Sequence, residues 1–163
     1  MGKDYIKDVY TVLIKSENLK RLLHYYPKDI VNDIPEPLSP TLPNISEDEE
    51  LNWQVIDETI LKTTKADDLV EKEICRIYVY LGSRDRTENS SISSQKLIID
   101  VFWHEKFEKD NRGRKIEQEL FKLLIGKRIT GIGKMKYYDG DPFNAPKNYQ
   151  AYRHVFEFGS LKK

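Results

Sequence analysis

Two stretches with an apolar residue at every second position constrain the fold of this chain most. From Glu73 to Leu81 every second residue is apolar, and the same alternation runs from Lys96 to His104. A period of two is typical of β-strands. The polar segment Gly82–Ser94 joins the two stretches and predicts an antiparallel hairpin with a long loop. The residues expected on the core face are Cys75, Ile77, Val79 and Leu81 in the first strand and Leu97, Ile99, Val101 and Trp103 in the second.

A helix and two further strands are predicted after the hairpin. Apolar residues recur at helical spacing from Ile116 to Leu124, and Gly126 then supplies a suitable C-terminal residue. Ile129–Tyr138 and Tyr149–Phe158 have strand patterns, and Asp139–Pro142 between them is typical of a turn. The expected fold class is α+β, a ββαββ arrangement in which one helix packs on an antiparallel or mixed sheet of about four strands.

The N-terminal part predicts helices followed by a proline-rich arm. Helical periodicity runs from Asp4 to Tyr26 in two pieces, and Ser16 between them is a candidate cap. Five of the seven prolines lie between Pro27 and Pro43, which favours an extended segment. Ser46–Glu49 reads as a capping box that opens a short helix. We therefore divide the chain into a helical segment 1–26, an arm with a short helix 27–70 and a core domain 71–163.

Composition narrows the classes of function. A chain of 163 residues suits one domain, and 27 basic residues balance 27 acidic ones, which argues against a general nucleic-acid binder. No apolar run approaches the roughly 20 residues that span a bilayer, so no membrane segment is expected. No secretory signal is recognised, and Ile6 stands where a myristoylation motif requires Ser or Thr. The single cysteine, Cys75, suits a reducing cytoplasm.

Candidate catalytic and binding motifs all have simpler structural interpretations. The histidines His24, His104 and His154 lack metal-ligand spacing, and Cys75 reads as a small buried apolar residue. Gly126–Gly133 follows a helix, whereas a phosphate-binding loop precedes one. Asp139–Asp141 lacks the glutamate of a calcium loop and reads as a tight turn. We expect no cofactor, no metal and no enzymatic activity.

A metal-dependent nuclease is the alternative that uses strand-borne carboxylates. Asp100 with Glu105 and Lys106 could hold magnesium and activate water. The expected pattern has a lysine two positions after the glutamate, whereas Lys106 follows Glu105 directly. A polar strand end explains the same residues, so the nuclease remains the weaker hypothesis.

The remaining polar and aromatic residues favour contacts with other proteins. Tyr, Trp and Arg are enriched as interface anchors, and the chain contains ten tyrosines. The candidate interface residues are Arg84, Asp85, Arg86, Trp53, Tyr78 and Tyr80.

The order of these elements resembles the tail-terminator, or tail-completion, proteins of long-tailed bacteriophages. The resemblance rests on Ile77–Leu81, Leu97–Phe102, the helix around Ile116–Leu124, and the strands Ile129–Tyr138 and Tyr152–Phe158. It implies a structural virion protein at the head–tail interface, assembled in the host cytoplasm. Its subunits would form a ring, usually a hexamer, that caps the tail tube and joins it to the head.

The resemblance also implies the partners. These are tail-tube protein, neck or head-completion proteins, and DNA that passes through the channel without specific binding. Gly82–Ser94 would correspond to the family's long hairpin loop, with Arg84, Asp85 and Arg86 as polar anchors. The segment 27–68 departs from the family pattern, and it would reach a neighbouring subunit or neck protein. A head-completion or stopper protein of the same neck is the alternative.

Overall fold

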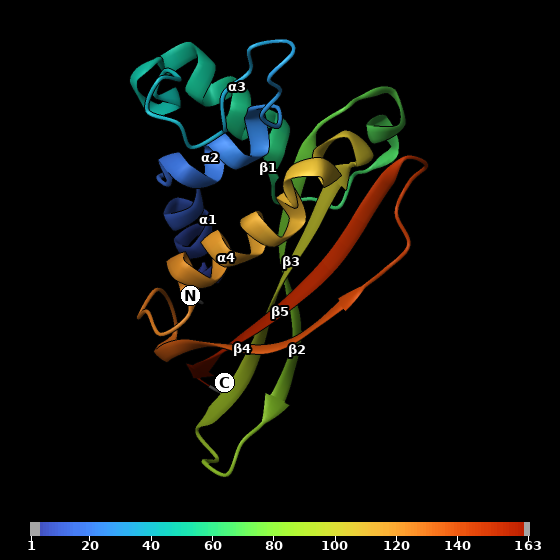
Figure 1. The fold of residues 1–163 in the computed structure, drawn as a ribbon. Helices are drawn as coiled ribbons and strands as arrows, with labels where there is room; N and C mark the ends of the chain where they lie inside the picture. The colour runs from blue at the N-terminus through green and yellow to red at the C-terminus, as the bar shows by residue number, and fades with distance from the viewer. Residues whose placement is uncertain (1–3, 162–163) are drawn as a thin grey trace.

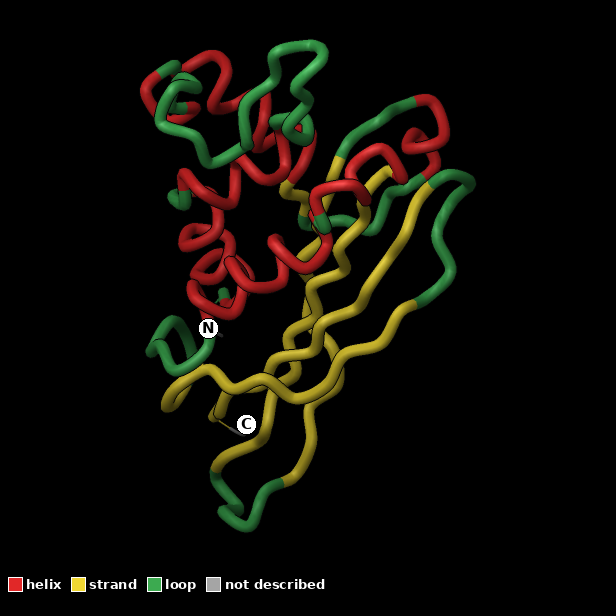
Figure 2. The backbone as a smooth tube through the Cα atoms, viewed as in Figure 1, coloured by secondary structure: helices red, strands yellow, loops and turns green. Residues whose placement is uncertain are grey.

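The computed structural model describes residues 4–161, which form a β-sheet with α-helices on one side of it (Figures 1 and 2). The α-helices are α1 (Tyr5–Ile14), α2 (Glu17–His24), α3 (Glu49–Thr59) and α4 (Arg112–Leu124). The strands are β1 (Ile60–Leu61), β2 (Cys75–Arg86), β3 (Ile92–His104), β4 (Ile132–Pro142) and β5 (Tyr149–Leu161). Short 3-10 helices are η1 (Ile45–Glu47), η2 (Asp67–Glu71) and η3 (Glu105–Asp110). The α+β class is confirmed.

The sheet has five strands in the order β1-β2-β3-β5-β4. The two-residue strand β1 pairs in parallel with Ile77 and Tyr78 of β2, and all other neighbours are antiparallel. The sheet is therefore mixed and has one strand more than the about four expected. The sequence pattern at residues 60–64 is compatible with a short strand, and the structure places β1 at its first two residues. Periodicity could not establish it, because two residues are too few to show an alternation.

The main core lies between the sheet and three helices. The alternating residues of β2 and β3 face α1, α2 and α4, as their pattern predicts, and Phe156 and Phe158 of β5 join them. Leu81 is the exception: it was expected on the core face, but it is 39% exposed, because it lies at the bulge where β2 leaves the helical layer. The expectation of one packed helix was too low, because Val9 and Leu13 of α1 and three leucines of α2 are buried in this same core. The N-terminal helices α1 and α2 thus share one hydrophobic core with the sheet and α4.

Arg112 ties α4 to α2 from inside this body. Its side chain is fully buried, and Nη1 donates hydrogen bonds of 2.6 Å to the carbonyl oxygens of both Leu22 and Tyr25. Nε and Nη2 donate to Asp110, just before the helix. Buried charges need such partners, because an unpaired guanidinium would lose its hydration without compensation.

The segment after α2 folds back onto that helix instead of extending as an arm. Arg21 of α2 donates from Nη1 to the carbonyl oxygen of Ser39 (2.8 Å) and from Nη2 to that of Leu42 (3.0 Å). Pro27 and Pro37 are buried. The prolines prevent regular structure here, and carbonyl groups of the irregular segment become acceptors for one arginine.

Helix caps agree with the sequence in one case and differ in the other. Ser16 caps α2, since its Oγ accepts a hydrogen bond from the Leu19 amide at 3.1 Å. Ser46 was expected to cap the next helix, but it lies in η1, and Asp48 caps α3 by accepting from the Leu51 amide. Both residues are good N-caps, and the turn of η1 decides between them.

Two polar segments that were predicted to be a loop and a turn form β-strand in the structure. The pairs Arg84↔Gln95, Asp85↔Ser94 and Arg86↔Ser93 extend the hairpin far into the expected Gly82–Ser94 loop. Asp139–Pro142 was expected to turn but pairs with β5 as the end of β4. In both places, main-chain hydrogen bonds to a neighbouring strand outweigh the low strand propensity of the side chains.

Candidate interaction surface

The end of the β2–β3 hairpin is a ribbon (residues 82–94) that projects beyond the helical layer (Figure 1). A bulge lies between Leu81 and Arg84, where the pairing with β3 shifts. Gln95 holds it, because Nε2 donates to the Gly82 carbonyl oxygen at 3.1 Å and Oε1 accepts from Arg84 Nε at 3.2 Å. Bulges bend a strand and re-aim its side chains. The ribbon is thus a shaped projection with its own side-chain support.

The sheet face opposite the helices carries charge pairs between β3 and β5. Asp100 and Arg153 stand opposite each other, with Arg153 Nε 2.8 Å from Asp100 Oδ1. The hydroxyl of Tyr80 donates to the other oxygen of Asp100 at 2.6 Å. Burial, and then the hydrogen bond to Asp100, raise the pKa of Tyr80 to about 12. Tyr80 is therefore a fixed neutral donor at neutral pH.

A second pair lies nearer the ribbon. Lys96 Nζ is 2.6 Å from Glu157 Oε2 and 3.5 Å from Asp85 Oδ2. The same nitrogen lies 3.8 Å from the ring centroid of Tyr138, a cation–π geometry. Lys96 is only 6% exposed, so water cannot compensate its charge, and these three neighbouring groups do so instead. This network joins the root of the ribbon to strands β4 and β5.

The structure does not gather the predicted interface residues at one place. Arg84, Asp85 and Arg86 are exposed on the ribbon. Tyr80 lies on the open face, whereas Tyr78 is 1% exposed and donates to the carbonyl oxygen of Lys65 within a second small core. Trp53 is 51% exposed on α3, at the other end of the molecule (Figure 1).

Sequence reasoning missed the residues that organise this surface. Gln95, Lys96, Tyr138 and Glu157 were not singled out, although a lysine inside an otherwise apolar strand is a signal that some partner must compensate it. The partner could not be named, since Glu157 is 61 positions away and strand register decides which residue it meets.

The histidines and the cysteine have structural roles in their surroundings. Burial lowers the pKa of His154 to about 4, and its Nδ1 is 2.9 Å from the hydroxyl oxygen of Tyr137. His104 caps η3 by accepting from the Lys106 amide, and the ring of His24 packs on Tyr25. Cys75 is fully buried, and desolvation raises its pKa to about 12, which opposes formation of a reactive thiolate.

The residues of the nuclease alternative are separated. Both oxygens of Asp100 are engaged by Arg153 and Tyr80. Glu105 is exposed in η3, and Lys106 pairs with Glu73. Within residues 4–161, three or more histidine, cysteine, aspartate or glutamate side chains nowhere converge in a way that could hold a metal ion. Asp139 and Asp141 lie on β4 rather than in a loop.

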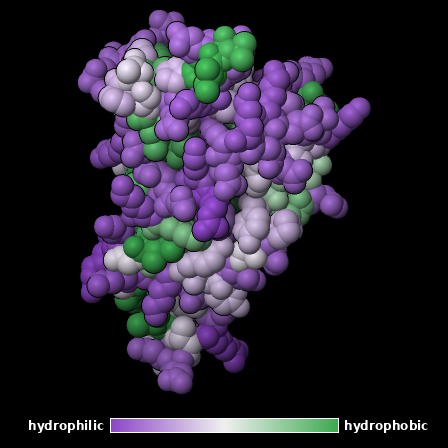
Figure 3. Space-filling model, viewed as in Figure 1, coloured by the Kyte–Doolittle hydropathy of each residue, from purple (hydrophilic) through white to green (hydrophobic). Residues whose placement is uncertain are grey.

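The surface seen in Figure 3 is mainly hydrophilic, with small separate hydrophobic patches. One patch lies over the loop after α2, where Ile30 is 86% and Val31 92% exposed. No helix among the described residues is long and apolar enough to cross a membrane.

Fold and surface together define a small α+β protein with helices on one face of a mixed sheet, a charge-paired open face and a projecting ribbon. The chain belongs to the YomW family, whose model matches residues 16–158. It is 30% identical over 174 residues to the SPbeta prophage-derived uncharacterized protein YomW of Bacillus subtilis (strain 168). That alignment covers 99% of each chain. The relationship indicates a phage-derived protein, and neither match names a tail terminator.

Proposed function

We propose that the protein is a structural component of the phage neck, a tail terminator whose subunits form a ring, a hexamer in the manner of the family it resembles. The ring would cap the tail tube and join it to the head. The prophage relationship supports a phage role. The resemblance in element order supports the neck.

The observation that carries this proposal is the β2–β3 ribbon. It extends strands of 12 and 13 residues past the helical layer and exposes Arg84, Asp85 and Arg86 (Figure 1). A supported ribbon loses less conformational entropy on binding than a flexible loop, so it suits a permanent contact with tail-tube protein or an adjacent subunit. A stopper or head-completion protein of the same neck would use such a projection in the same way.

A non-enzymatic role is part of the proposal. The best carboxylate candidate, Asp100, pairs with Arg153 and accepts a hydrogen bond from Tyr80. Its oxygens therefore hold neighbouring strands together instead of binding a metal ion. The zero net charge of the sequence suits a channel through which DNA slides without specific binding. The protein would be located in the virion after assembly in the host cytoplasm.

The test is the oligomeric state and partner of the purified protein. Mass photometry and negative-stain microscopy should show a ring, and the ring should bind the end of polymerised tail-tube protein. Binding to the portal end of the head instead would assign the stopper role. A strict monomer under all conditions would contradict both. Magnesium-dependent cleavage of linear or branched DNA that Asp100→Ala abolishes would establish the nuclease.

A further inference from the structure

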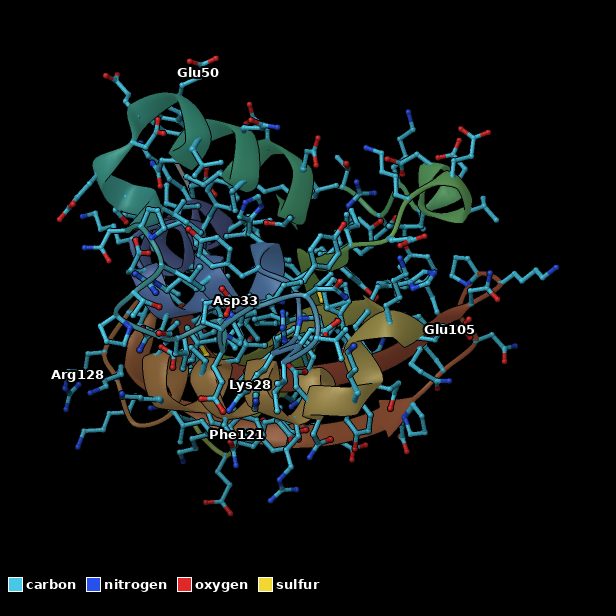
Figure 4. The ribbon with its side chains drawn as sticks, turned by 45° about the horizontal axis from the view of Figure 1, so that its top comes forward. Lys28, Asp33, Glu50, Glu105, Phe121 and Arg128 are labelled. Atoms are coloured by element: carbon cyan, nitrogen blue, oxygen red, sulfur yellow. The ribbon has the colours of Figure 1, made fainter. Side chains whose placement is uncertain are left out.

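The solvent face of α3 combines an exposed tryptophan with acidic residues. Glu50, Trp53 and Asp57 are spaced three and four positions apart, so they lie on one side of the helix, and all are exposed. The opposite side buries Val55 and Ile56. Figure 4 shows Glu50 directed away from the body. A half-exposed tryptophan with charged neighbours is the composition of an interface anchor and its rim.

The charges of the whole chain are polarised, although they sum to zero. Residues 44–73, which include α3 and η2, hold ten acidic and three basic residues. Residues 74–163 hold 18 basic and 11 acidic residues. Figure 1 places α3 and η2 at one end of the molecule, and the ribbon and the start of β4 at the other. The first end is therefore acidic, and the sheet-bearing part is basic.

A groove of about 550 Å³ lies at the ribbon end, between the hairpin and β4. Ile92, Ile132 and Phe158 contribute apolar lining, and Lys134 and Lys136 contribute positive charge. Ile132 is 37% exposed, and both lysines are exposed. Glu157 also lines the groove, but its charge is paired with Lys96. An apolar floor with cations beside it is complementary to an aromatic ring flanked by carboxylates.

We propose that the Trp53 face of α3 in one subunit docks into the β4–ribbon groove of a second copy of this chain. The ring of Trp53 would cover the apolar lining, and Glu50 and Asp57 would meet Lys134 and Lys136. The two surfaces lie at opposite ends of one chain, so the contact joins copies head to tail. A head-to-tail contact leaves each copy with one free surface of each kind, and a closed ring satisfies them all. The inference rests on the proposed ring and names its closing contact.

Charge reversal tests the contact. Glu50→Lys with Asp57→Lys makes one surface basic, and Lys134→Glu with Lys136→Glu makes the other acidic. Each double variant alone should lose the ring in mass photometry, because like charges meet at every contact. An equimolar mixture of the two should restore rings, because the variants can alternate around an even-numbered ring. Recovery on mixing is a result that misfolded variants cannot produce.

Matched controls carry the same change of charge elsewhere. Glu36→Lys with Glu105→Lys, and Lys109→Glu with Lys147→Glu, alter exposed residues outside both surfaces and should leave the ring intact. Trp53→Ala should raise the concentration for half-assembly about 30-fold, the effect of a typical hot-spot residue, while the melting temperature of the unassembled subunit stays unchanged. The wild-type ring should also dissociate as salt is raised.

The possible results separate this contact from the ring itself. A wild-type ring that persists in both charge-reversal variants and in Trp53→Ala would overturn the contact while leaving the proposed function standing. A wild-type protein that never assembles would overturn both. If the lysine variant keeps its ring but loses binding to a DNA oligonucleotide, the groove serves nucleic acid, and the contact between copies is wrong.

Discussion

Lys96 and Glu157 face each other across β3 and β5, with 2.6 Å between Nζ and Oε2. The lysine is nearly buried, whereas the glutamate side chain remains 27% exposed. The pair thus lies at the boundary between the sheet interior and solvent. At such a position the main energetic effect of the pair is that neither charge remains uncompensated, and the attraction between the two charges contributes less.

Removing one partner of this pair should cost more stability than removing both. Glu157→Gln leaves a buried ammonium group with weaker compensation from Asp85, and we expect a loss of about 1–3 kcal/mol in the free energy of unfolding. Lys96→Met combined with Glu157→Gln should recover most of that loss. Urea unfolding of the two single variants and the double variant measures the coupling. Additive losses would show that the two side chains act independently.

Arg112 should tolerate no substitution, including lysine. Arg112→Ala leaves the carbonyl groups of Leu22 and Tyr25 and the carboxylate of Asp110 without their shared donor, so we expect a loss of about 3–5 kcal/mol. Arg112→Lys should recover little, since one ammonium group cannot reproduce the planar set of donors. The exposed Arg114→Ala, measured by the same thermal unfolding, should stay within about 0.5 kcal/mol of wild type.

Glu17 should contribute to stability above about pH 4 and lose that contribution in acid. Burial alone would raise its pKa, but hydrogen bonds from Ser46, Ile45 and Arg21 outweigh burial and lower it to about 2. The unfolded carboxylate takes up its proton near pH 4.3, before the folded one does. Stability should therefore fall between about pH 4.3 and 2, by on the order of 2 kcal/mol. Urea unfolding at low pH should show a shallower fall for Glu17→Gln than for Glu36→Gln.

His154 should make stability depend on pH in a different window. Its folded pKa of about 4 lies below the unfolded value near 6.5, so only the unfolded state gains a proton between these values. Stability should be full above pH 6.5 and decrease by on the order of 3 kcal/mol as the pH falls to 4. His154→Gln should flatten this part of the profile. A profile between pH 4 and 6.5 that is unchanged by the substitution would contradict the assignment.

Local patterns in the sequence predicted the centres of the main elements but not their ends. The alternation around Ile77 and Ile99 arises because one face of each strand packs against the core, so the sequence alone predicts these strand centres. Arg84–Arg86 and Asp139–Pro142 have no such alternation, and they are strands because neighbouring strands satisfy their main chains. The folded segment after α2 depends on Arg21, whose role becomes visible only once Ser39 and Leu42 are near it.

The candidate surface was predictable in part. Arg84 and Arg86 were selected for their chemistry and are exposed, whereas Tyr78 has the same aromatic signal and is buried, because η2 covers that end of the sheet. Tyr80 differs from Tyr78 by one step along the same strand face. The two tyrosines differ in exposure because a segment distant in the sequence covers only Tyr78, and residue type alone cannot predict such coverage.

The position of β5 between β3 and β4 also sets the order in which the sheet can be completed during synthesis. β5 follows every other strand in the chain, yet it pairs with β3 from Ile92 to His104 and separates β3 from β4. While the ribosome has not released β5, the inner edge of β3 has no partner, and β4 has no strand beside it. The nascent hairpin must therefore remain soluble with an open edge of unpaired main-chain groups, and its final pairing bridges up to 69 positions, from Ile92 to Leu161. Slow, non-local closure of this kind makes the last strand the step most exposed to aggregation.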